Sequence, residues 1–122
     1  MRVEKCALIA SGTIYARFSG ELNRAERLAS FERIAEAVAR TGATEIIVDM
    51  RAVTPMDCVD QYGGREWGHG KIAELLYSAG AARVLIATLP KDSLAGDFIT
   101  ACRTQRIRAE CLAFFDILDR VA

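Results

Sequence analysis

The stretch from Glu45 to Val59 constrains the fold of this chain more than any other part of the sequence. It opens with Ile46-Ile47-Val48, a short and continuous apolar run of β-branched residues. A second run of the same kind, Val84-Leu85-Ile86-Ala87, follows after enough chain for a helix. Because continuous apolar runs suit central strands that are covered on both faces, the pattern predicts two parallel strands joined by a crossover helix.

The rest of the chain fits an α/β fold. Cys6–Ala10 and Thr13–Phe18 flank Ser11-Gly12, which predicts an antiparallel hairpin. Helices are expected at residues 23–41, in the second half of the crossover up to Gly80, and at residues 93–105. A final strand is expected at Cys111–Phe115, and a short helix is expected to follow it from Asp116. The predicted order is β-β-α-β-α-β-α-β-α, a single mixed β-sheet with an N-terminal antiparallel hairpin and the remaining strands parallel, packed with helices. A length of 122 residues suits one domain, expected to span residues 1–122.

Charge and hydropathy narrow the range of partners. Sixteen basic residues balance sixteen acidic ones, so we expect no nucleic acid binding. No apolar run approaches the roughly 20 residues of a membrane-spanning helix. Met1 to Lys5 leads directly into strand-like sequence, without the pattern of a signal peptide. These features predict a cytoplasmic protein without a membrane span, and they leave a homo-oligomer open.

The cysteines predict neither a metal site nor a disulfide framework. They stand at positions 6, 58, 102 and 111 without a Cys-x-x-Cys pair, and the chain has one histidine. That inventory is poor for zinc, and we predict no metal and no cofactor. A chain of this length can build a hydrophobic core without disulfide bonds, so its thiols are expected to be reduced. Cys6, Cys102 and Cys111 are expected to be small core residues.

The segment after the first central strand is the main candidate for a functional site. It ends in Asp57-Cys58, where a helix is expected to begin, and Thr54, Asp57 or Cys58 could cap that helix. A small polar side chain and a thiol at a helix start suit an anion or an activated cysteine. Two interpretations stay open: a capped helix start with an inert cysteine, or a functional surface formed by Thr54, Asp57, Cys58 and Asp60.

A glycine-rich segment, Gly63 to Gly70, contains the only tryptophan and the only histidine, Trp67 and His69. It is not a phosphate-binding loop of the Walker type, because the required spacing of glycines and the following Ser/Thr are missing. Trp67 and His69 are either ordinary loop residues or a lip over a small apolar ligand. No serine lies near His69 in the sequence, and no catalytic residue is predicted.

Three arginines, Arg103, Arg106 and Arg108, cluster at the end of the last predicted long helix. Cations are favoured at a helix C-terminus, so the helix dipole could account for all three. An anion or phospholipid site is the alternative.

Three passages together resemble the STAS domains, the fold of bacterial anti-sigma-factor antagonists and of the cytoplasmic tails of sulfate transporters. The chain is equally similar to a related bacterial group, antagonist-like with a lipid-transfer-like fold. The three passages are Phe18-Ser19-Gly20-Glu21-Leu22-Asn23, the segment from Ile47 to Cys58, and the closing segment from Phe114 to Ala122. They match the strand that enters the first helix, the strand and switch loop, and the closing strand and helix of that family.

The resemblance implies a non-enzymatic module that binds a protein partner. In the antagonists a partner kinase phosphorylates the serine after the aspartate, and the added charge breaks the complex. Here Cys58 follows Asp57, so the resemblance implies the binding surface but not the serine switch.

Three hypotheses follow for the function. The leading one is a cytoplasmic regulatory module whose partner could be an anti-sigma-type kinase. The alternative is a small-molecule or lipid carrier gated by Trp67 and His69. A third is redox sensing by Cys58, which a lowered thiol pKa at a helix start would favour.

Overall fold

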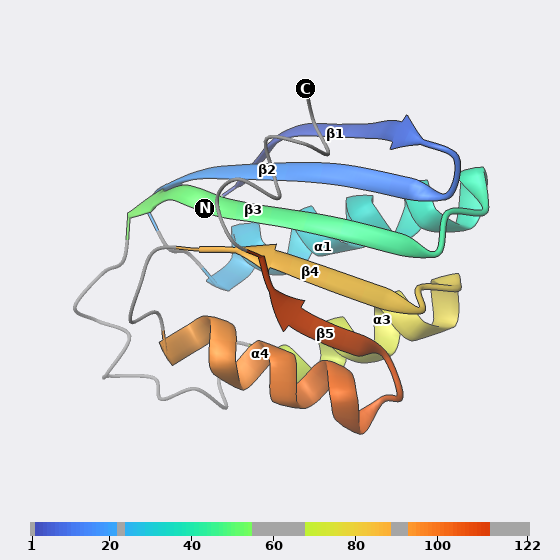
Figure 1. Ribbon diagram of the computed structural model, residues 1–122. Coiled ribbons are helices and arrows are strands. Elements are labelled where there is room, and N and C mark those ends of the chain that lie inside the picture. The colour runs from blue at the N-terminus through green and yellow to red at the C-terminus, as the bar shows by residue number, and fades with distance from the viewer. Residues whose placement is uncertain (1, 22–23, 55–67, 89–92, 113–122) are drawn as a thin grey trace.

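The computed structural model describes residues 2–21, 24–54, 68–88 and 93–112 (Figure 1). Its elements are β1 (Arg2–Ala10), β2 (Thr13–Glu21), α1 (Arg24–Thr41), β3 (Glu45–Thr54), α3 (His69–Ala79), β4 (Arg83–Ala87), α4 (Ser93–Thr104) and β5 (Arg108–Cys111). The strands form one sheet in the order β1-β2-β3-β4-β5. β1 and β2 are antiparallel, and every other neighbouring pair is parallel. The predicted mixed α/β sheet with an N-terminal hairpin is confirmed.

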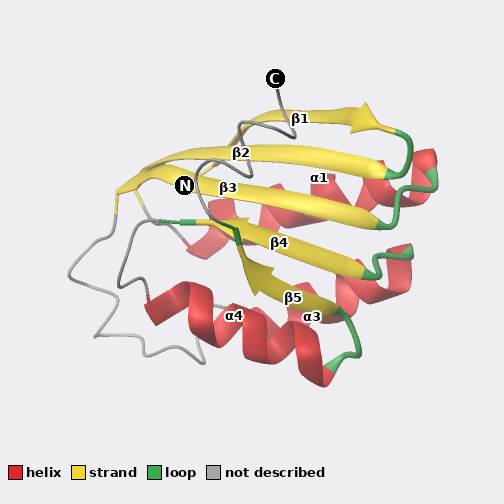
Figure 2. Ribbon diagram, viewed as in Figure 1, coloured by secondary structure: helices red, strands yellow, loops and turns green. Residues whose placement is uncertain are grey.

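The helices and the sheet form two layers (Figure 2). One face of the sheet and the inner faces of α1, α3 and α4 share a single apolar core. Phe18, Phe31 and Phe98 form its aromatic centre, with ring centroids 5.2 Å apart between Phe18 and Phe31 and 5.3 Å apart between Phe31 and Phe98. The core therefore joins β2, α1 and α4, which are far apart in the sequence.

The opposite face of the sheet carries a second, smaller apolar cluster. Tyr15, Ile47 and Leu85 form it, on β2, β3 and β4. Ile46, Ile47 and Val48 are all fully buried, so the continuous apolar run of β3 does bury both of its faces. No helix within the described part of the chain lies over this cluster.

Two of the described helices end at glycine as their sequences predict. Gly42 follows α1 with φ of 74°, and Gly80 follows α3 with φ of 111°. Both values lie in the left-handed region, which glycine adopts without a steric penalty. The amide of Ala81 donates to the carbonyl of Leu76 at 2.9 Å, which closes the last turn of α3 before β4 begins.

Two strands differ from the prediction. β3 continues to Thr54, well beyond the apolar run, because its pairing with β2 continues as far as Glu21 and Thr54. β5 begins at Arg108, three residues before the expected start at Cys111. Only Ala109 of β5 is buried, so the strand lacks the apolar run on which the prediction relied. Residues 113–115, the Asn23 cap and the closing helix from Asp116 lie outside the described residues.

The predicted burial of the cysteines is confirmed for two of the three that the structure describes. Cys102 is buried and Cys6 is half-buried, as small core residues are expected to be. Cys111 is exposed, so the prediction that it belongs to the core is wrong. Its position on the edge strand β5 explains this, because no strand in the described residues pairs with β5 on its outer side.

Candidate functional site

The carboxyl ends of β2, β3 and β4 and the first turns of α1, α3 and α4 gather at one end of the sheet, which we call the loop end (Figure 1). Glu21 and Thr54, the last residues of β2 and β3, are register partners there. This is the end at which α/β proteins generally place their sites, because helix starts and strand ends meet there. The main candidate segment from the sequence leaves the sheet at this end.

The predicted site residues are only partly described. Thr54 is the last residue of β3, so the segment that follows it starts from a fixed position in the sheet. Asp57, Cys58, Asp60 and Trp67 lie outside the described residues. The functional surface assigned to Thr54, Asp57, Cys58 and Asp60 therefore stays a prediction.

His69 lies in the interior of the protein instead of on an exposed surface. It is the first residue of α3, and only 6% of it is exposed. Gly68 precedes it with φ of 72°, a left-handed turn that directs the chain into the helix. The lip that would pair His69 with Trp67 stays a prediction, because the position of Trp67 is not described.

His69 contacts a buried arginine that the sequence analysis did not single out. Arg27, the fourth residue of α1, is 1% exposed, and its Nη2 lies 3.2 Å from Nδ1 of His69. The guanidinium carbon of Arg27 lies 5.3 Å from the ring centroids of both Phe31 and Phe98. Two aromatic faces therefore stabilise the cation by cation–π contact, and the histidine accepts a hydrogen bond from it.

This contact fixes the protonation state of His69. Arginine only donates hydrogen bonds, so Nδ1 must be an acceptor and the imidazole must be neutral. Burial, and next the charge of Arg27, lower the pKa of His69 to about 4, although Asp97 acts in the opposite direction. The Nε2 atom then carries the proton, and it is buried without a hydrogen-bond partner among the described residues.

A second polar cluster lies on the other face of the sheet. Asp49 of β3 is 2% exposed, and its register partner is Ala87, the last residue of β4. Tyr15 donates its hydroxyl to Oδ2 of Asp49 at 2.5 Å. Arg51 holds both oxygens of the same carboxylate, Nε to Oδ1 at 2.9 Å and Nη2 to Oδ2 at 2.7 Å. This paired geometry is the strongest kind of arginine–carboxylate contact.

The three groups of this cluster stabilise one another's charge states. Burial disfavours the ionised form of Asp49, but the hydrogen bonds from Arg51 and Tyr15 outweigh it and lower the pKa of the carboxyl. Burial, together with the hydrogen bond to Asp49, raises the pKa of Tyr15 to about 12. Asp49 is therefore ionised and fully engaged at neutral pH, which suits a structural support better than a proton-transfer group.

The predicted arginine cluster divides between a helix, a turn and a strand. Arg103 lies in the last turn of α4, as the helix dipole favours, whereas Arg106 follows the helix and Arg108 begins β5. All three lie at the end of the sheet opposite to the loop end. They therefore belong to a different surface from Thr54 and His69.

The described residues offer no metal site. No group of three or more His, Cys, Asp or Glu side chains that could hold a metal ion occurs within them. None of the described helices has the length and apolar character needed to cross a membrane. The same part of the chain contains two thiols whose pKa burial raises, Cys6 and Cys102, the latter to about 12.

Comparison with known proteins gives a clear answer for the fold. No family model and no curated protein sequence matches the chain. The structure of the anti-sigma factor antagonist SpoIIAA in its unphosphorylated form matches with a TM-score of 0.55 and 20% identity, over 96% of this chain and 94% of that chain. The Bacillus cell fate determinant SpoIIAA in the phosphorylated form matches with a TM-score of 0.53 and 19% identity, over 97% and 98%. The chain thus has the fold of an anti-sigma factor antagonist along nearly its whole length, which confirms the predicted STAS-like architecture.

Proposed function

We propose that this protein is a non-enzymatic regulatory module of the cytoplasm that binds a partner protein through its loop end. The observation that carries the proposal is the shared fold with SpoIIAA over 96% of the chain. The binding surface consists of Thr54, Asp57, Cys58 and Asp60, the segment that resembles the switch loop of the antagonists. An anti-sigma-type kinase is the kind of partner that this resemblance favours.

The geometry of the described residues supports a binding surface at this end. The hydrogen bond from Tyr15 to Asp49 ties β3 to β2 shortly before the candidate segment leaves β3, and the buried Arg27–His69 contact holds the start of α3. A segment held between two rigid elements loses less conformational entropy when a partner binds. The two clusters therefore hold the two elements, β3 and α3, that flank the candidate segment.

Regulation of this module differs from that of the antagonists it resembles. SpoIIAA has been captured in phosphorylated and unphosphorylated forms. In this chain Cys58 stands where the resemblance places the phosphorylated serine. A serine kinase cannot modify a thiol, so binding of the partner continues without a phosphate signal at this position.

A pull-down with charge-reversed variants tests the proposal. The tagged protein is incubated with a lysate of the source organism, as wild type and as the double variant Asp57→Lys/Cys58→Arg. The matched control is Glu74→Lys/Tyr77→Arg, which places the same new side chains on the exposed face of α3. We expect one protein to be recovered with the wild type and the control, and to be lost with the loop variant.

The contrary result is equal recovery of every bound protein by the wild type and the loop variant. Circular dichroism of each purified variant separates loss of binding from loss of folding. A variant that keeps the wild-type spectrum and thermal midpoint but loses its partner supports the loop end as the interface.

A further inference from the structure

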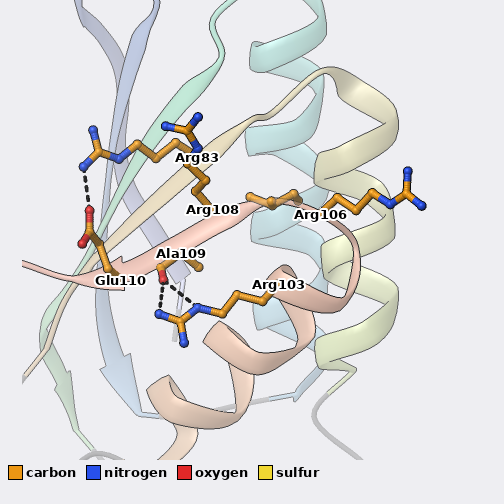
Figure 3. Close-up of a pocket in the computed structure, with 7 residues that line it drawn as sticks. Arg83, Arg103, Arg106, Arg108, Ala109 and Glu110 are labelled. Carbon is orange, nitrogen blue, oxygen red and sulfur yellow. Dashed lines mark hydrogen bonds and ion pairs between the residues drawn. The ribbon is translucent and has the colours of Figure 1, made fainter.

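The end of the sheet opposite to the loop end contains a pocket in which four of the seven lining residues are arginines (Figure 3). Its volume is about 580 Å³, and its charged residues are Arg83, Arg103, Arg106, Arg108 and Glu110. Its lining thus contains four cations and one anion, in a chain whose sixteen basic and sixteen acidic residues balance. Such local segregation of charge in a neutral protein creates an attractive potential for an anion.

Two of the arginines stand side by side on neighbouring strands. Arg83 and Arg108 are register partners in the parallel pair β4–β5, and in Figure 3 their side chains lie close together. Like charges directly across a strand pair are destabilising. Glu110 and Glu45 pair with Arg83, at 2.6 Å and 3.3 Å, but no side chain in the described part of the chain pairs with Arg108. Arg83 is thus already compensated by two carboxylates, whereas an anion beside Arg108 would compensate the second charge of the pair.

Arg106 occupies a backbone position that favours glycine. It follows α4 with φ of 66°, and it is the one described residue other than glycine with a positive φ. The amide of Ile107 donates to the carbonyl of Cys102 at 2.9 Å, which is the hydrogen bond of a Schellman helix end. Glycine stands at the corresponding position after α1 and α3. After α4 this position is an arginine, whose side chain makes the left-handed backbone conformation strained. In Figure 3 this side chain extends away from the other three arginines.

Arg103 is already fixed in position by the edge of the sheet. Its Nε and Nη2 donate to the carbonyl of Ala109, at 3.2 Å and 2.9 Å. This contact covers a carbonyl on the free edge of β5, which disfavours the addition of a strand from another protein. The helix dipole accounts for Arg103 at the end of α4, but not for Arg83 and Arg108, which lie on strands. A small anion fits these observations better than an extended peptide.

We propose that this arginine pocket is a binding site for the phosphate group of a small ligand. Arg108 and Arg83 contact its oxygens, while Arg106 and Arg103, which also line the pocket, add positive charge. A phosphate has enough oxygens and charge to accept hydrogen bonds from two guanidinium groups at once, which a single carboxylate does less well. The phosphate belongs either to a soluble phosphomonoester or to a lipid headgroup, which share this chemistry. The site is independent of the partner surface at the loop end.

The test is an NMR titration of the isotope-labelled full-length chain with inorganic phosphate, against sodium chloride at matched ionic strength. We expect saturable shifts of the amide signals of residues 106–110 with phosphate only. The double variant Arg106→Ala/Arg108→Ala is expected to bind phosphate about tenfold more weakly. The matched control is Arg33→Ala/Arg40→Ala, which removes two exposed arginines of α1 and the same net charge; its affinity for phosphate is expected to be unchanged.

A second arm separates the two sources of phosphate. The same three proteins are sedimented with vesicles of phosphatidylcholine that contain phosphatidic acid. Sedimentation of wild type and control but not of the pocket variant assigns the site to a lipid headgroup, whereas phosphate binding without sedimentation assigns it to a soluble ligand. Either result supports the site. Equal loss of affinity in the pocket variant and the control, or shifts with phosphate no larger than with chloride, overturns it.

Discussion

The buried contact between Arg27 and His69 predicts how the stability of this protein depends on pH. Burial and the neighbouring Arg27 lower the pKa of His69 from 6.5 to about 4 in the folded state. Between these two values the unfolded chain binds a proton that the folded chain rejects. The free energy of unfolding therefore rises with pH across this window, and the stabilisation is lost as the pH falls through it.

The size of the effect follows from the shift in pKa. One pKa unit corresponds to about 1.4 kcal/mol, so lowering the pH from 7 to 4 is expected to reduce the free energy of unfolding by about 3 kcal/mol. His69 is the only histidine in the chain, which makes this window simple to assign. The pKa of Asp49 is lowered from 3.8, so that carboxylate keeps its charge across the window.

Urea unfolding at several pH values between 4 and 7 measures this dependence, for the wild type and for His69→Gln. The Gln side chain can still accept a hydrogen bond from Arg27, but it does not titrate. We expect the variant to lose most of the pH dependence that the wild type shows, while the urea dependence of the free energy stays the same. Parallel pH profiles for the two proteins would refute the placement of a neutral, buried His69 against Arg27.

Three further predictions concern single residues outside this contact. Asp49→Asn is expected to lower the free energy of unfolding by about 2 kcal/mol, because it weakens the charge-assisted hydrogen bonds from Tyr15 and Arg51; urea unfolding measures this, and an effect no larger than that of Glu32→Gln on the exposed face of α1 would contradict it. Arg106→Gly is expected to raise the free energy of unfolding by about 1 kcal/mol, because glycine adopts positive φ without strain; thermal unfolding measures this, and a lowered midpoint would argue against a strained helix end. Iodoacetamide at neutral pH is expected to label Cys58 much faster than Cys102, whose thiol pKa burial raises to about 12; peptide mass mapping gives both rates, and equal rates would remove the redox hypothesis.

The elements with strong apolar periodicity could be predicted from the sequence. The crossover helix illustrates this, because Ile72 and Leu76 form its buried stripe and Gly80 ends it, as the spacing of those residues predicts. The strand β5 could not be placed in the same way. Its exposed face consists of Arg108 and Glu110, and Glu110 forms an ion pair with Arg83. Because these side chains are charged, the strand has no apolar run, and the apolar pattern predicted a strand at later residues.

The polar clusters were harder to predict than the fold. Arg27 lies four residues before Phe31 and seven before Ile34, on the buried stripe of α1, and this spacing is a signal that could have identified it. Nothing in the sequence pairs it with His69, because that contact joins residues 42 positions apart. Tyr15 and Asp49, 34 positions apart, meet for a similar reason: the parallel pairing of β2 and β3 brings them together. Contacts of this kind depend on the register of the sheet, which periodicity alone does not determine.

The location of these clusters bears on the proposed function. Arg27 and His69 lie on the helical face, and Asp49 lies on the opposite face, yet both clusters flank the segment that leaves β3 at Thr54. Apolar residues of similar size would often stabilise such positions at least as well as buried charges do. Buried polar groups that break the local pattern tend to occur where function requires a fixed geometry. One cluster on β3 and one at the start of α3 are therefore what the proposed partner surface requires, because they hold the two elements between which the candidate segment runs before the partner arrives.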